Sequence, residues 1–313
     1  MKKTLKFLGA IAAVAIVVTI FFTINKRKYN AVGYEKESTQ AIISETNNSY
    51  AILSSETNNL YVMLADEYLD DDDLSELYSE EDILTRLSKL NDDLNKNFDY
   101  YELSFQALQS LEYYNLDDDF VKVYNRKGDK IQNQAIKIDG RSHYVTSLNT
   151  VQVNKRFFDS YLASIEKGEA FNDDDYILST SENIPVLLGY NYTPYYNIGD
   201  TLKLNYLGSD MTFYIKGFLS ENLEFIKDNE TISMDNYICV PSFKIASASQ
   251  QTDSEQDLVF KIRYYLQKNR GFIQYGINND IKKIKQEIND LANKYDLAYT
   301  VLNTTYNISP NKT

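Results

Sequence analysis

The chain begins with a hydrophobic pattern that differs from the rest of the sequence. Basic residues flank an uncharged run from Phe7 to Ile24 on both sides. As a helix rising about 1.5 Å per residue, such a run spans roughly 27 Å, close to the thickness of a bilayer's hydrocarbon core. We therefore predict a transmembrane anchor over residues 1–28, a stalk or linker over residues 29–49, and a large water-exposed body.

A cleaved secretory signal is the alternative to an anchor. The apolar part of such a signal is usually roughly 7–15 residues long and ends at a small-x-small site. The run here ends in Thr23-Ile24 with no Ala or Gly pair before the basic cluster, which favours an uncleaved anchor. Basic residues at both ends leave the orientation open. A single Cys in 313 residues suits an exported protein without disulfides, so we expect the body outside the cell.

Two regions of the body, one near each end, combine helix-like and strand-like patterns. Apolar residues that recur every three or four positions predict amphipathic helices, and short apolar runs beside them predict strands. In chain order, the predicted elements are a strand at 60–64, a helix at 83–98, a strand at 103–111, a strand at 258–262, a helix at 281–295 and a strand at 298–302. We predict that residues 50–120 and 256–306 form an α/β lobe of two β-α-β units, in which each helix covers one face of a shared sheet.

The middle of the body predicts short strands. The first runs, separated by turns that contain glycine, are 121–124, 136–138 and 144–145. Leu202–Tyr206 and Met211–Ile215 alternate around Gly208, which favours a β-hairpin. We predict a β-rich lobe over residues 121–255, inserted into the α/β lobe. The predicted fold class is therefore α+β, with one N-terminal transmembrane helix and a two-lobed extracytoplasmic domain.

Charge and the scarcity of reactive side chains narrow the function classes. The net charge of −13 opposes binding to nucleic acid or to an anionic membrane surface, whereas a cationic peptide is electrostatically compatible. One His and one Cys cannot assemble an ordinary zinc site, and no G-x-x-x-x-G-K-[ST] motif is present. A Ser-His-Asp triad would have to use His143, whose neighbour Ser142 faces the other side of its strand. Cys239 lies in an apolar run, which predicts a buried thiol. We predict no enzyme, no cofactor and no metal.

Several clusters remain as candidate sites. The acidic runs Asp70–Asp73, Asp117–Asp119 and Asp173–Asp175 lack the spacing of a calcium loop, and we interpret them as solvated loops or turns. Gly199 and Gly217 are interpreted as turn and strand-end positions where a side chain is not tolerated. Exposed aromatic residues mark contact surfaces. The candidate contact surface is therefore the tyrosine-rich segment that contains Tyr190, Tyr192, Tyr195 and Tyr196, although tyrosine is abundant throughout the chain, at 27 residues.

Five segments between Val153 and Leu219 follow one another in a specific order. They are V-x-x-x-F-F at Val153–Phe158, G-x-x-F with following acids at Gly168–Asp175, an apolar strand at Ile184–Gly189, I-G-D at Ile198–Asp200, and a strand closing on K-G-F-L at Tyr214–Leu219. This order resembles the extracytoplasmic core domain of MacB-like and FtsX-like ABC transporter permeases.

The resemblance implies a two-lobed body that follows a first transmembrane helix, with the N-terminus in the cytoplasm and the body outside the cell. Its implied role is mechanical transmission, in export or sensing, to an ABC ATPase subunit through a further membrane-spanning permease subunit. The substrate would be a cationic peptide or a lipid-like molecule. Such permeases continue into three more membrane helices, whereas this sequence reaches Thr313 near where the second would begin. A split subunit, a truncated permease and a free-standing binding or sensor module therefore stay open, and a surface hydrolase has no supporting motif.

Overall fold

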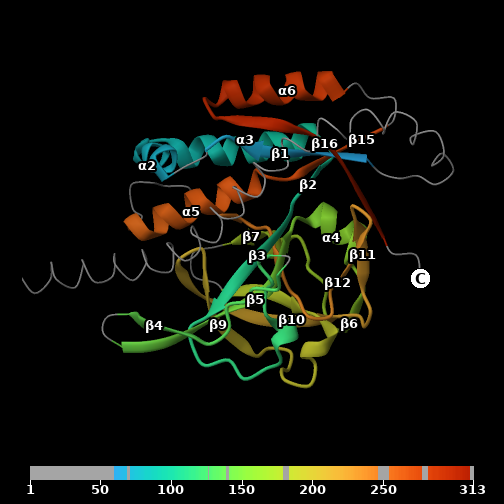
Figure 1. The fold of residues 1–313 in the computed structure, drawn as a ribbon. Helices are drawn as coiled ribbons and strands as arrows, with labels where there is room; N and C mark the ends of the chain where they lie inside the picture. Colours follow the sequence, from blue (N-terminus) through green and yellow to red (C-terminus); the bar gives the residue numbers. More distant parts are fainter. Residues whose placement is uncertain are drawn as a thin grey trace, which may run out of the picture. The chain divides into compact units, whose positions relative to one another are not determined.

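A computed structural model describes residues 60–68, 71–125, 127–138, 141–178, 183–245, 254–276 and 281–310 (Figure 1). Packing divides them into two compact units. The described part of unit 1 lies within Ser110–Ser147, and unit 2 comprises Asn59–Gln109 with Leu148–Thr313. The anchor and stalk predicted for residues 1–49 lie outside the described residues, and the predicted lobe boundaries stay a prediction.

The described residues form five α-helices and sixteen strands. The helices are α2 (Asp71–Ser79), α3 (Ile83–Asn97), α4 (Lys155–Tyr161), α5 (Glu255–Lys268) and α6 (Ile281–Lys294). The strands are β1 (Leu60–Asp66), β2 (Tyr100–Tyr101), β3 (Leu103–Ser110), β4 (Gln134–Ile138), β5 (Arg141–Val153), β6 (Ile165–Gly168), β7 (Ile177–Leu178), β8 (Ile184–Leu188), β9 (Thr201–Tyr206), β10 (Ser209–Leu219), β11 (Glu224–Lys227), β12 (Glu230–Ser233), β13 (Ile238–Pro241), β14 (Lys244–Ile245), β15 (Phe272–Tyr275) and β16 (Tyr299–Pro310). Short 3₁₀ turns are η2 (Asp118–Phe120), η3 (Asp174–Tyr176) and η4 (Tyr190–Tyr192).

Unit 2 contains a six-stranded sheet in the order β12-β11-β16-β1-β15-β2, in which all neighbours are antiparallel. The units β1-α3-β2 and β15-α6-β16 interleave, so that β15 lies between β1 and β2, and β1 lies between β15 and β16. Each unit is therefore a split β-α-β motif. Leu60 of β1 pairs with Asn307 of β16, and these two strands lie side by side in Figure 1.

The two helices of these motifs form where the sequence predicts them. Helix α3 buries an apolar stripe that includes Ile83, Leu87, Leu90 and Leu94, and α6 buries Ile284, Ile288 and Ala292. The helices also meet each other, because the Lys294 ammonium lies 2.7 Å from the Asp93 carboxylate. Both helix predictions are confirmed, since a one-sided stripe at this spacing can be buried only by a helix.

The second sheet of unit 2 closes on itself. Its order is β13-β8-β10-β9-β3-β5, and β13 also pairs with β5, which completes a ring of six strands. The predicted hairpin is confirmed as β9 and β10, with Tyr206 paired to Ser209. Leu207 and Gly208 both have positive φ, 54° and 94°, as the favoured two-residue hairpin turn requires.

One apolar core joins the six-stranded sheet to the ring within unit 2. Tyr61, Phe225 and Ile308 reach it from the sheet, and Val151 and Leu187 reach it from the ring. Phe157 and Phe158 of α4 are buried in the same core. The ring and the sheet are therefore packed against each other through a shared hydrophobic interior.

Unit 1 is smaller and has its own apolar cluster of Ile131, Ile136 and Val145. Strand β4 pairs with the first part of β5, with Ile136 opposite His143. The strand predicted at 121–124 is wrong, because this segment forms isolated bridge residues, such as Val123 opposite Lys130, and no continuous strand.

The predicted fold class is wrong. The described residues are dominated by strands, and the predicted α/β lobe is an antiparallel sheet in which the strands of each β-α-β unit are not neighbours. Leu258–Ile262, predicted as a strand, is the middle of α5. None of the described helices is both long enough and apolar enough to cross a membrane.

The physical reason for the error at α5 is a helix start that outweighs a short apolar run. The Ser254 side chain accepts a hydrogen bond from the Asp257 N–H, and the Asp257 carboxylate accepts one from the Ser254 N–H. This capping box satisfies amide groups that only a helix start exposes. The helix then buries side chains on most of its circumference, so no polar face breaks the apolar run into a helical stripe.

Candidate functional site

Three of the segments that carry the family resemblance lie directly beside the fifth, β10, in unit 2: they contain Gly168 of β6, strand β8, and Gly199, whose N–H donates to the Ile215 carbonyl oxygen. Strand β10 pairs with β6 over Leu219 to Gly217, with β8 over Phe213 to Phe218, and with β9 over its first half. The Asn154 side chain caps α4 by accepting the Phe157 N–H at 3.0 Å. Motif residues between Gly168 and Leu219 thus lie on or beside one strand, whereas Phe157 and Phe158 of the first segment share an apolar core with Leu219.

Two glycines of these segments face each other at close range. Gly168 of β6 pairs with Gly217 of β10. A Cβ at Gly168 would lie 2.4 Å from the Lys216 carbonyl oxygen, and one at Gly217 would lie 2.6 Å from that of Lys167. Gly168 also has a φ of +84°. The interpretation of Gly217 as a position that excludes a side chain is confirmed.

The acids after Phe171 form a turn and a buried ion pair. Asp175 accepts the Asn172 N–H at 2.7 Å and pairs with the Lys216 ammonium, and both charged side chains are almost completely buried. Asp173 lies 3.7 Å from Lys155. The turn role predicted for Asp173–Asp175 is confirmed, and the pair with Lys216 fixes this turn to β10 beside Gly217.

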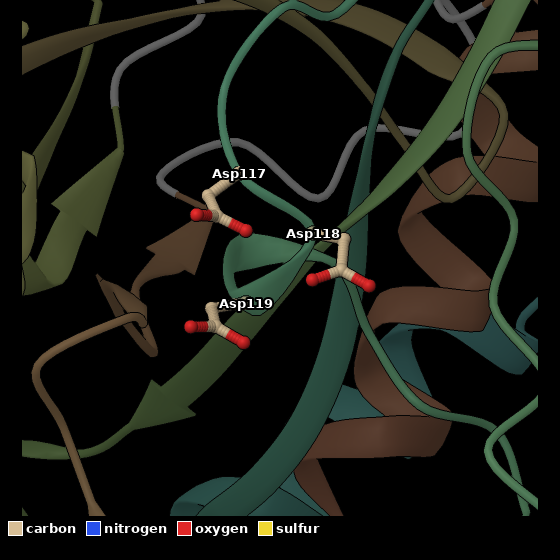
Figure 2. Close-up of side chains that lie close together, drawn as sticks. All are labelled: Asp117, Asp118 and Asp119. Carbon is tan, nitrogen blue, oxygen red and sulfur yellow. The ribbon is translucent and has the colours of Figure 1, made fainter.

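The acidic trio Asp117, Asp118 and Asp119 belongs to unit 1 and is exposed (Figure 2). One carboxylate oxygen of each lies within 4.8 Å of the others. Lys130 lies 3.0 Å from Asp118 and holds the pKa of that carboxyl below its usual value. Exposed acidic groups are common without a bound ion, and the spacing does not match a calcium loop. The trio by itself therefore identifies no metal site. The side chains of the run Asp70–Asp73 lie outside what the structure describes.

The tyrosine-rich segment divides between core and surface. Tyr192 is buried, with its ring 6.1 Å from that of Tyr196. Tyr190 and Tyr196 are half-buried, and burial together with the nearby Asp200 raises the pKa of Tyr196. Only Tyr195 is well exposed, at 51 %, and the same loop exposes Ile198 to the same extent. Ile198 adds an apolar side chain to the predicted contact surface, and Tyr192 does not belong to it.

The reactive residues weighed from the sequence fall in different units. Cys239 is completely buried in β13 of unit 2, and burial raises the pKa of its thiol. The prediction of a core thiol is confirmed. His143 lies half-buried in the unit 1 part of β5.

A buried polar network in unit 2 went unrecognised in the sequence. Its centre is Glu102, the single residue between β2 and β3, with a side chain about 5 % exposed. One carboxylate oxygen accepts hydrogen bonds from Asn91 and Asn95 of α3, at 2.9 and 3.1 Å. The other accepts from the Ser242 hydroxyl and from the Lys268 ammonium, the latter at 3.1 Å.

Lys268 ends α5 and is buried with Glu102. Its ammonium also donates to the Ser242 carbonyl oxygen at 3.0 Å and to the Ser242 Oγ at 3.1 Å. The Ser242 hydroxyl itself donates to the Glu102 carboxylate and not to Lys268. The Ser242-Lys268 contact therefore does not form a nucleophile and base. No signal in the sequence pointed to this network, because its members are separated by up to 177 positions, from Asn91 to Lys268.

No known protein family matches this chain, and neither curated proteins nor solved structures give a match.

Proposed function

We propose that this chain is a non-enzymatic, membrane-anchored protein of the ABC permease type, whose body lies outside the cell. The observation that carries the proposal is that three of the resembling segments lie beside the fifth, β10, with Gly168 paired to Gly217, while the first shares an apolar core with Leu219. Their packing gives Gly168, Gly217 and Asp175 a physical role in the same part of unit 2.

The arrangement of the first and last strands supports the same proposal. Leu60 and Asn307 are direct ladder partners, so the chain enters and leaves this sheet at the same end. A body attached to a membrane through one end of a sheet can move as a whole relative to its anchor. A displacement of β1 or β16 would then be transmitted directly to the end of the sheet that is attached to the membrane.

The proposed partners are those that the resemblance implies, an ABC ATPase subunit and a further membrane-spanning permease subunit. The net charge of −13 favours a cationic peptide over an anionic ligand, and a lipid-like substrate stays compatible with the resemblance. The body would bind or sense the substrate and would transmit a movement to the partner subunits.

A stand-alone anchored binding or sensor module is the second candidate. The exposed Tyr195 and Ile198 favour it, because aromatic and apolar side chains are enriched at contact surfaces. In this case the same loop would bind its target without any transport partner.

The test is affinity purification of the full chain from its native membrane in mild detergent. We expect an ATPase subunit and a multi-helix membrane subunit to co-elute. Repeated recovery of the chain alone in good yield would overturn the permease proposal and favour the sensor module. The double variant Tyr195→Ala with Ile198→Ser tests whether the loop binds the target. The matched control is Ile177→Ser, because Ile177 is similarly exposed elsewhere in unit 2.

A further inference from the structure

We propose that the Glu102 network fixes the orientation of the six-stranded sheet relative to the strand ring, so that unit 2 moves as one rigid body. The structural part of this proposal stands independently of the function above. Its use in passing a movement toward the membrane rests on the proposed permease role.

Glu102 forms the shortest chain connection between the two sheets. Tyr101 ends β2 in the six-stranded sheet and Leu103 begins β3 in the ring, so one residue spans the crossing. The return from β10 to β11 takes Ser220 to Leu223. A charged side chain buried at a one-residue crossing is unfavourable unless every lone pair is satisfied.

The network satisfies this requirement on the sheet side and on the ring side at once. Asn91 and Asn95 bind the carboxylate from α3, and Lys268 binds it from α5. Ser242 binds it from the chain that leaves β13 of the ring. The Ser242 Oγ in turn accepts a hydrogen bond from Gln152 of β5 at 3.1 Å.

Backbone contacts reinforce the same point. The Asn154 N–H donates to the Glu102 carbonyl oxygen at 3.2 Å, and the Ser242 N–H donates to the Val153 carbonyl oxygen at 2.7 Å. The Tyr100 hydroxyl donates to the Lys268 carbonyl oxygen at 2.6 Å. Both sheets and helix α5 are thus tied to the crossing by directional bonds.

The hydrogen bonds of this network are directional, whereas the contacts of the apolar core that the two sheets share are not. Apolar contacts depend on buried area and tolerate small rotations and sliding. Hydrogen bonds weaken steeply once their distance or angle departs from a narrow range. A buried ion pair adds little net stability compared with apolar residues of similar shape, and specifying one conformation is its better-supported use.

The experiment compares distances between two nitroxide labels in the full chain in mild detergent. Asn289→Cys on α6 and Lys203→Cys on β9 are exposed attachment sites, and the native Cys239 is buried away from the reagent. Glu102→Leu combined with Lys268→Met replaces the ion pair with apolar side chains. Asp175→Leu combined with Lys216→Met is the matched control, because that buried pair lies outside the crossing.

We expect one narrow distance distribution for the native chain and for the Asp175-Lys216 control. The Glu102-Lys268 double variant removes the acceptor of the buried Asn91 amide and Ser242 hydroxyl, so its melting temperature should fall, and below that temperature its distribution should broaden or shift. A native-width distribution in that variant would overturn the proposal.

The single variant Glu102→Gln covers the case in which the double variant does not fold. It keeps the shape of the side chain but leaves the Lys268 ammonium without a counter-charge, and the melting temperature should fall by about 10 °C. An unchanged distance distribution below its melting temperature would also overturn the proposal. Because the distances need no partner, broadening without any co-eluting subunit would retain the rigid-body role and reject the permease role.

Discussion

The facing glycines Gly168 and Gly217 allow a prediction whose magnitude can be worked out from geometry. An alanine at either position must place a methyl group against a backbone carbonyl of the paired strand, at 2.4 and 2.6 Å. Ordinary contacts of this kind are well above 3 Å, so a backbone must move. Gly199 provides the matched control, because it has a φ of +89° but open space where its Cβ would lie.

The three substitutions separate two costs. Gly199→Ala should lower the free energy of unfolding only through the left-handed backbone conformation, by about 1–2 kcal/mol. Gly217→Ala has no such backbone penalty and should lower it through overpacking, by about 1–3 kcal/mol. Gly168→Ala carries both, so its cost should be about 2–5 kcal/mol. Because Gly168 and Gly217 share one contact, the double variant should cost less than the sum of the two single variants.

Urea unfolding of the full chain in mild detergent, followed by far-ultraviolet circular dichroism, measures these differences. The chain has no Trp, so fluorescence is a weaker probe. The slope of the free energy with urea should stay constant across the series. If Gly168→Ala falls within about 0.5 kcal/mol of Gly199→Ala, the close approach of β6 to β10 is not real, and the convergence of the motif segments loses its physical basis.

Three further predictions address other parts of unit 2. Ser254→Ala removes the cap of α5 and should lower stability by about 1 kcal/mol in the same urea assay, with Ser254→Asp as a variant that retains a capping side chain. The Lys294 ammonium and the Tyr295 hydroxyl hold the pKa of Asp93 below its usual value, so the contact between α3 and α6 is complete above about pH 4 and is lost as the pH falls through the lowered pKa. Asp93→Asn should therefore weaken the acid dependence of melting, and an unchanged dependence would contradict this assignment. Burial raises the pKa of Cys239, so iodoacetamide at pH 8 should label the chain in urea but not when folded, as mass spectrometry would show.

Elements with a one-sided apolar pattern could be predicted from the sequence. Helices α3 and α6 each bury a single stripe and leave a polar face, and the β9–β10 hairpin carries its own turn at Leu207-Gly208. In these segments the local pattern and the tertiary environment agree, so the pattern alone is sufficient.

Elements buried on most sides could not be predicted in the same way. Helix α5 packs apolar side chains around most of its surface, and its apolar run resembles a strand as much as a helix. The interleaving of β1 and β15 depends on pairing between the two ends of the body, which no local pattern specifies. Glu102 looks like an ordinary surface acid in the sequence, because its partners Ser242 and Lys268 come from distant segments.

The tyrosine-rich segment shows the limit for candidate sites. Composition indicated a contact surface, but the sequence could not show that Tyr192 turns inward while Tyr195 stays exposed. The alternation that would reveal the inward side is absent in a 3₁₀ turn followed by a loop. Which tyrosines are available to a partner is therefore a property of packing.

Two connections lead from the exposed loop on the ring to the sheet that carries Leu60 and Asn307, and they differ in the movements that they can pass on. The close-packed core transmits compression, because its side chains leave no room to approach further. Its apolar contacts are non-directional, so they set no bond angle of their own. The directional bonds to Glu102 resist rotation. If unit 2 works as a lever, the Glu102-Lys268 double variant should still co-elute with the proposed partners, because its exposed surface is unchanged. A rotation imposed at Tyr195 should then no longer reach the six-stranded sheet in full, which the labels on β9 of the ring and on α6 would detect.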